Sequence, residues 1–162
     1  QGLVIDGTEI DAIHAGISNN ARDAVTRSVT VRLGPLGYTG IEHNLNATFE
    51  DSTIDMPEAA MQSYGIAHAN HMDKQVVRRV KSRAGISAQF YSAQDQARTR
   101  DVLIEDCEFE YTHAALSWNV PGVSVNGNVG RRRGHYAMRD SGTEPLRKLG
   151  AGALIDRGGN VW

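Results

Sequence analysis

The sequence predicts an all-β chain folded as a parallel β-helix, a solenoid of about six stacked rungs. A short phrase occurs seven times, and in each copy Gly or Ala precedes an aliphatic residue. A second apolar column lies about half a repeat upstream of the first. Neither an amphipathic helix nor a leucine-rich frame occurs in each period, so a horseshoe solenoid fits poorly.

The two apolar columns define the expected strands. Intervals of 24, 25, 20, 30, 22 and 16 residues separate the aliphatic residues of the first column, which are Ile17, Ile41, Ile66, Ile86, Leu116, Met138 and Leu154. The second column consists of Ile5, Val31, Phe49, Val77, Ile104 and Val125. Each rung therefore carries at least two short strands, and its inward residues stack on those of the next rung. We expect the first column, from Ile17 to Met138, to form one inward stack.

The rungs follow one another along the chain. The first spans residues 1–27, the second opens at 28–32, and the later ones are 47–70, 74–89, 101–119 and 123–138. An insertion beginning at Pro57 is expected to form one helical turn. Residues 91–100 and 140–150 lack the period, so we interpret them as loops, which are frequent places for function. Residues 152–162 add a half rung.

Three phrases carry a family resemblance: VLIEDCEFEYTHAALSWN, LVIDGTEIDAIHAGISN and VSVNGNVGRRRGHYAM. They resemble the rungs of the right-handed parallel β-helices of pectate lyases, polysaccharide epimerases and phage tailspikes, and most of all a tailspike or surface-spike shaft. The resemblance implies a right-handed helix, a homotrimer or capping partner domains, a virion or extracellular location, and a bacterial surface polysaccharide as partner. No catalytic signature of a subfamily is present, so no active-site residue is carried over.

Length and composition limit the function classes. The 162 residues are interpreted as one domain, 1–162, and the repeat starts without a polar cap, which predicts a fragment or processed part of a longer chain and no stable isolated monomer. The formal net charge of −2 and the lack of a basic face argue against nucleic acid. No apolar run approaches the ~20 residues of a membrane span, so no membrane partner is expected. The single Cys107 is expected to be buried and unreactive, and no cofactor is expected.

Carboxylates at matching positions of different rungs are the catalytic candidates. Glu50 and Glu105 lie two rungs apart, at about twice the ~4.8 Å strand spacing, which fits the ~6.5 to 9.5 Å between the acid and base of inverting glycosidases. Glu108 is the third candidate. Arg78 falls between Glu50 and Glu105, so a surface ladder of opposite charges explains the same pattern without a substrate.

The flank of the fifth rung is the candidate binding surface. Flat rings can stack on sugars, and arginines can hold an acidic sugar by paired hydrogen bonds. For Trp118, core packing and sugar stacking are both open interpretations. The substrate-binding candidates are Tyr111, His113, Trp118, Arg131, Arg132 and Arg133.

Other polar residues recur with the repeat. His14 and Tyr38 begin a polar series three residues before the aliphatic column, which we expect to line one outer ridge. His68, His71 and Asp73 come nearest to a metal-ligand spacing, but no helix or cysteine supports it, and no metal is predicted. An amide ladder at the corners is expected from Asn20, Asn44, Asn70, Asn119 and Gln89.

Two function classes follow. In the first, the domain binds and possibly cleaves a bacterial surface polysaccharide, as a glycoside hydrolase or lyase if it is an enzyme. In the second, it is a non-catalytic structural spike, spacer or assembly domain of a virion or adhesin. A groove with carboxylates and aromatic residues favours the first class, and flanks of alternating charge favour the second.

Overall fold

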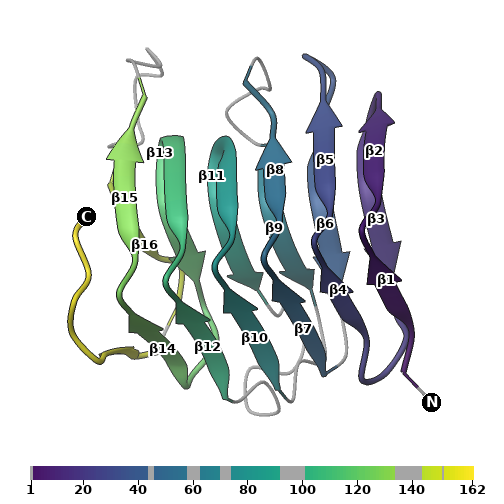
Figure 1. Ribbon diagram of the computed structural model, residues 1–162. Helices are drawn as coiled ribbons and strands as arrows, with labels where there is room; N and C mark the ends of the chain where they lie inside the picture. The colour runs from purple at the N-terminus through teal and green to yellow at the C-terminus, as the bar shows by residue number, and fades with distance from the viewer. Residues whose placement is uncertain are drawn as a thin grey trace.

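The chain forms a parallel β-solenoid, as the sequence predicts. The computed structural model describes residues 2–43, 46–57, 63–69, 74–91, 101–133, 144–150 and 152–162. Within those ranges every regular element is a strand, and all strand pairs are parallel. Figure 1 shows the strands stacked in layers, with the chain advancing one coil at a time from the N-terminus to the C-terminus.

One layer of the solenoid, sheet A, takes one strand from each coil. Its neighbouring strands are 21 or more residues apart in sequence, because the chain completes a coil between them. In spatial order the strands are β1 (Val4–Asp6), β4 (Val25–Arg27), β7 (Ala47–Glu50), β10 (Gln75–Arg78), β12 (Val102–Glu105), β14 (Val123–Asn126) and β17 (Leu154–Asp156).

The rest of each coil belongs to sheet B, which contains two ladders. The first ladder runs through β2 (Glu9–Ala12), β5 (Thr30–Leu33), β8 (Thr53–Asp55), β11 (Lys81–Tyr91), β13 (Glu108–Trp118) and β15 (Val129–Arg132). The second runs through β3 (Ala15–Asn19), β6 (Thr39–His43), β9 (Tyr64–Ala69), the C-terminal halves of β11 and β13, and β16 (Leu146–Lys148). The two 11-residue strands, β11 and β13, therefore join the ladders.

The number of coils differs slightly from the six expected, because sheet A already has seven strands. The predicted helical turn after Pro57 and the loop at 92–100 lie outside the described residues, as do residues 140–143 of the loop predicted at 140–150. The rest of that prediction is wrong, because Leu146–Lys148 form strand β16, which pairs with β13 inside the stack.

The inward stack agrees with the prediction at Ile17, Ile41, Ile66 and Leu116, but not at its fourth member. Leu154, assigned to the same column from the sequence, lies instead on β17 of sheet A. Cα pairing aligns Ile17 with Ile41 and Ile41 with Ile66, but Ile66 then meets Ala88. Ile86 pairs two residues earlier, with Tyr64 on one side and Ala114 on the other, and Met138 lies outside the described residues. The stack that the structure contains is Ile17, Ile41, Ile66, Ala88, Leu116 and Leu146.

The second apolar column also needs one correction. Val31 lies on β5 in sheet B, and the sheet A position expected for it is occupied by Thr26, which pairs with Ile5 and Phe49. Thr26 is fully buried, so a polar residue occupies a core position that the hydrophobic pattern did not reveal. Most coils therefore carry three short strands, in agreement with the minimum of two.

Glycine before the aliphatic column is explained by close packing, as expected. A Cβ built on Gly40 would lie 2.5 Å from Cγ2 of Ile54 and 2.6 Å from the carbonyl oxygen of Gly65. Any side chain there would displace either the first ladder or the next coil. The small residue thus lets the chain bend between the two ladders of sheet B.

A corner residue in the left-handed (αL) backbone conformation follows each of the first six strands of sheet A. Its φ values lie between 50° and 63°, and the residue after it points inward on the inner coils. Short polar residues and Gly tolerate this conformation best, and they fill most of the positions. The corner residues are Gly7, Ser28, Asp51, Arg79, Asp106 and Gly127.

A pair of side-chain amides, from Asn128 and Asn160, lies near this corner, at positions that were not among those expected for the amide ladder. The side-chain amide of Asn128, which is fully buried, donates to Oδ1 of Asn160 at 2.9 Å and to the carbonyl of Ile104 at 3.0 Å. Among the expected members, Gln89 pairs with Ala67 and Ser117, two residues before the position of Asn119. Asn44 and Asn70 lie outside the described residues, and Asn20 is exposed.

Candidate functional site

Residues of alternating charge end the strands of sheet A. Arg78 Nε donates to Oε2 of Glu50 at 2.6 Å, and Arg27 lies 2.8 Å from Asp6. Glu50 and Glu105 flank Arg78 in the register, two strands apart. The structure therefore contains the ladder of opposite charges that the sequence suggested, built from Asp6, Arg27, Glu50, Arg78 and Glu105.

Glu50 is the most enclosed of the three predicted catalytic carboxylates. Its side chain is 11% exposed, and Arg79 approaches it at 3.4 Å in addition to Arg78. The guanidinium groups of Arg78 and Arg79 thus both form ion pairs with the Glu50 carboxylate. A substrate would have to displace one of them before it could reach Glu50.

Glu108 lies on a different sheet from Glu50 and Glu105. It begins β13 in sheet B, beyond the corner at Asp106 and Cys107, and its carboxylate is 3.2 Å from Nζ of Lys81. The structure thus pairs Glu50 and Glu105 on one flank and places Glu108 on another.

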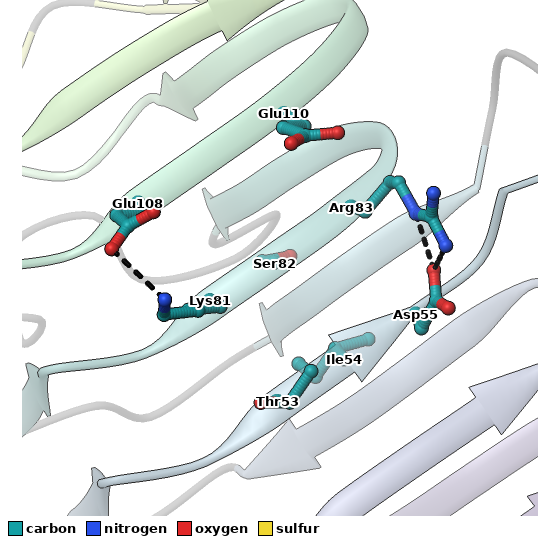
Figure 2. A pocket seen from close by; sticks show the side chains of 8 residues that line it. All are labelled: Thr53, Ile54, Asp55, Lys81, Ser82, Arg83, Glu108 and Glu110. Carbon is teal, nitrogen blue, oxygen red and sulfur yellow. Dashed lines mark hydrogen bonds and ion pairs between the residues drawn. The ribbon is translucent and has the colours of Figure 1, made fainter.

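Glu108 belongs to a shallow depression of about 200 Å³ on the outer side of β8, β11 and β13. Figure 2 shows its side chains, with an ion pair between Lys81 and Glu108 and another between Arg83 and Asp55. Both cations are thus engaged by carboxylates of neighbouring strands. We call this the charged depression; its lining is Thr53, Ile54, Asp55, Lys81, Ser82, Arg83, Glu108 and Glu110.

The predicted arginine run lies beside the charged depression. Arg131 faces Glu110 in the register of β13 and β15, and Arg133 Nε is 3.6 Å from a Glu110 carboxylate oxygen. Arg131 and Arg132 are exposed, and Arg132 pairs with Tyr111 in the register. The run therefore continues a second alternating column, in which Asp11, Arg32, Asp55, Arg83, Glu110 and Arg131 occupy successive strands.

The aromatic candidates on the fifth rung are buried. Tyr111 and Trp118 belong to the hydrophobic core, and the Trp118 indole donates to the carbonyl of Gly152 at 3.0 Å. Of the two interpretations open for Trp118, the structure shows core packing. Neither ring presents a face on which a sugar can stack.

His113 is also buried, and its ring contacts Arg147. The guanidinium can only donate, so Nε2 of His113 accepts the hydrogen bond. Burial lowers the pKa of His113, and the charge of Arg147 lowers it further. His113 is therefore a neutral core residue at neutral pH.

Cys107 is buried at the left-handed corner, as expected. Burial raises the pKa of its thiol to about 12. Its Sγ lies 3.2 Å from the carbonyl oxygen of Glu105, and its amide donates to Oδ1 of Asn128. A protonated, enclosed thiol is a poor nucleophile.

The polar series upstream of the aliphatic column forms an outer ridge only in its first members. His14 and Tyr38 stack with ring centroids 5.8 Å apart, whereas Ser63 is buried. No group of three metal-ligating side chains occurs among the described residues, and no helix there is long and apolar enough to cross a membrane. The side chain of His68, with His71 and Asp73, lies outside the described part of the chain.

A second, larger depression lies on the outer side of the second ladder and contains exposed aromatic rings. Its volume is about 420 Å³, and β6, β9 and β11, which adjoin one another in Figure 1, supply most of its lining. Tyr38 is 49% exposed and Tyr91 is 41% exposed. We call it the tyrosine groove; its lining is Tyr38, Thr39, Glu42, Tyr64, Ala67, Gln89, Tyr91 and Leu149.

Tyrosine rings in contact form one side of the tyrosine groove, and a small residue, Ala67, lies at its base. Tyr64 packs edge to face on Tyr38, with ring centroids 5.4 Å apart. Burial is the main cause that raises the pKa of the Tyr64 hydroxyl, and the neighbouring Tyr38 raises it further. Between the walls, Ala67 pairs with Glu42 on one side and Gln89 on the other. A methyl group between two longer polar side chains leaves the hollow open.

Sequence reasoning did not find this groove. Tyr38 and Tyr64 come three and two residues before their aliphatic residues, Ile41 and Ile66, and Tyr91 ends the longer strand β11. The recurrence of tyrosine near the start of two successive second-ladder strands was the available signal.

Comparison with known proteins adds no assignment: no protein-family model, no curated protein and no solved structure matches this chain.

Proposed function

We propose that this β-solenoid domain binds a polysaccharide in the tyrosine groove, as part of a phage tailspike-like or other surface-spike protein. The observation that carries the proposal is the groove itself, in which exposed Tyr38 and Tyr91 flank polar Glu42 and Gln89. Apolar ring faces suit the C–H faces of sugars, while a few polar groups fix their hydroxyls.

The arrangement of the groove suits an extended chain. Its residues come from three adjacent strands, which span two strand spacings or about 9.6 Å, so more than one sugar ring can lie across it. The tyrosine walls lie in or directly beside hydrogen-bonded strands of the second ladder, so we expect little ordering of the protein on binding.

The proposal is for binding, and cleavage is a separate matter. The predicted catalytic residues Glu50 and Glu108 are each held by a cation, and neither they nor Glu105 line the groove. If Glu50 and Glu105 do cleave a glycan, they act at the flank of sheet A and not in the groove, so Glu50→Gln and Glu105→Gln should abolish the release of reducing ends while binding in the groove remains. Unchanged release in both variants would exclude these two residues as the catalytic pair.

One observation favours the second candidate, a non-catalytic spacer. One column of alternating charge runs along the outer side of sheet A, and another runs along the first ladder. Such columns fix the register of successive coils without any ligand. A bacterial polysaccharide partner, a homotrimer or capping domains, and a virion or extracellular location remain predictions; light scattering of the purified chain tests the trimer.

A glycan array tests the binding proposal. The wild-type chain should bind at least one class of bacterial polysaccharide, and the double substitution of Tyr38→Ala with Tyr91→Ala should lower that binding about tenfold or more, because two stacking faces are lost. Ile13→Ala, which truncates an exposed residue outside the groove, is the matched control. Absence of any bound glycan, or equal binding by the double variant, would favour the spacer.

A further inference from the structure

We infer that the tyrosine groove selects glycans containing a sugar with a free, protonated amino group, which Glu42 recognises. This inference rests on the proposed glycan binding and adds the class of ligand. Its basis is a carboxylate without a described partner in an aromatic groove.

Glu42 differs from most carboxylates on the outer sides of the solenoid. It is half-buried on β6 and lines the groove, yet no described residue forms an ion pair or hydrogen bond with its carboxylate. Most of its counterparts on or beside sheet A and the first ladder do have cationic partners; Glu105, whose carboxylate also has no ion pair with a described residue, does not line the groove. These paired carboxylates include Asp6, Glu9, Glu50, Asp51, Asp55, Glu108 and Glu110.

The neighbours of Glu42 in the groove also suit a cation. Tyr38, Tyr64 and Tyr91 offer aromatic faces, which attract an ammonium group within about 6 Å of the ring centroid. A carboxylate and an ammonium group form a charge-assisted hydrogen bond, about twice as strong as a neutral one. An N-acetylated sugar lacks the positive charge, and an acidic sugar would be repelled.

Arg147, whose charge acts on Tyr64 of the tyrosine groove, is not a partner of Glu42. Arg147 lowers the pKa of Tyr64 through its charge, but it contacts His113 and does not line the groove. In the register it lies beyond Gln89 and Ser117, four strands from Glu42. At the ~4.8 Å strand spacing, about 19 Å of backbone separates the two positions. Among the described residues, no Lys or Arg lines the groove, and none forms an ion pair with Glu42.

The test compares two probes of equal length, a fully deacetylated glucosamine hexamer and its fully N-acetylated form, at low salt and below the pKa of the amine. The wild-type chain should bind the deacetylated hexamer about tenfold more tightly. Glu42→Gln keeps the shape and should bring the ratio near one, while affinity for the acetylated hexamer stays the same. Glu9→Gln, which removes the same charge on β2, should leave the ratio unchanged.

Equal affinity of the wild-type chain for the two hexamers, or an unchanged ratio in Glu42→Gln, overturns the inference. In either case, if the Tyr38→Ala and Tyr91→Ala double variant still loses binding of both, the proposed function stands. If the wild-type chain binds neither hexamer, the inference falls, and the glycan array decides separately about the proposed function.

Discussion

Replacement of Leu116 by Ala tests the inward stack on which the whole solenoid depends. Leu116 is 0% exposed on β13, between Ala88 of β11 and Leu146 of β16. The substitution removes three carbon atoms, and at ~0.8 kcal/mol per buried carbon group the lost transfer free energy is about 2.4 kcal/mol. Ala88 has no side chain that can move into the space, so a cavity cost is added. We expect a total loss of about 3 to 4 kcal/mol, within the usual range for buried Leu to Ala.

The assay is urea unfolding followed by far-ultraviolet circular dichroism, with the free energy of unfolding extrapolated to water. The midpoint should fall while the denaturant slope stays constant, because the same surface becomes exposed on unfolding. Ile13→Ala is the control: its side chain is 75% exposed, so it should cost less than about 0.5 kcal/mol. A loss below about 1 kcal/mol for Leu116→Ala would show that the stack does not support the fold.

Three further predictions concern buried or paired groups. Cys107 should resist alkylation in the native chain and react only on unfolding, since burial raises its pKa to about 12; rapid stoichiometric labelling of the folded chain would disprove this. Because the pKa of His113 is lowered on folding, the unfolded state binds its proton first, so stability should fall as pH drops below the ordinary value of 6.5 and level off once the folded pKa is passed. The His113→Gln variant should not show this loss of stability when its unfolding by urea is measured across the same pH range. Glu50→Gln should lower the free energy of unfolding by roughly 1 kcal/mol, and less in high salt, because Arg78 and Arg79 lose a partner; an effect independent of salt would contradict the ion-pair explanation.

The fold was predictable because each coil repeats its small-then-aliphatic pair at a similar place. Gly40 and Ile41 align with Gly65 and Ile66, as their sequences suggest. At the next coil Ala88 and not Ile86 aligns with Ile66, and the pairing of β11 with β13 shifts register between Ala84 and Ile86. A bulge changes register by local backbone geometry, and the sequence pattern around Ile86 carries no mark of it.

The candidate sites were predictable only where side chains share one column. The alternation of Glu50, Arg78 and Glu105 was visible, because equivalent positions of adjacent strands must lie side by side. The direction of Trp118 was not, because it lies at the end of β13, where the strand turns toward the corner and the chain near Gly152 covers the ring.

The tyrosine groove was missed for a related reason. Tyr38 precedes β6, Tyr64 begins β9 and Tyr91 ends β11, so the three rings occupy different positions in their coils. They come together because the side chains reach across the ladder over the small Ala67. No single column of the sequence contains all three.

The most direct test of the account is to map the bound glycan by changes in backbone amide chemical shifts, with the best ligand from the array. The largest changes are expected at Glu42, Ala67 and Gln89, which lie side by side across the three strands of the tyrosine groove. Changes confined to Glu105 and Arg131, with none in the groove, would contradict this expectation and return the site to the flank of the fifth rung.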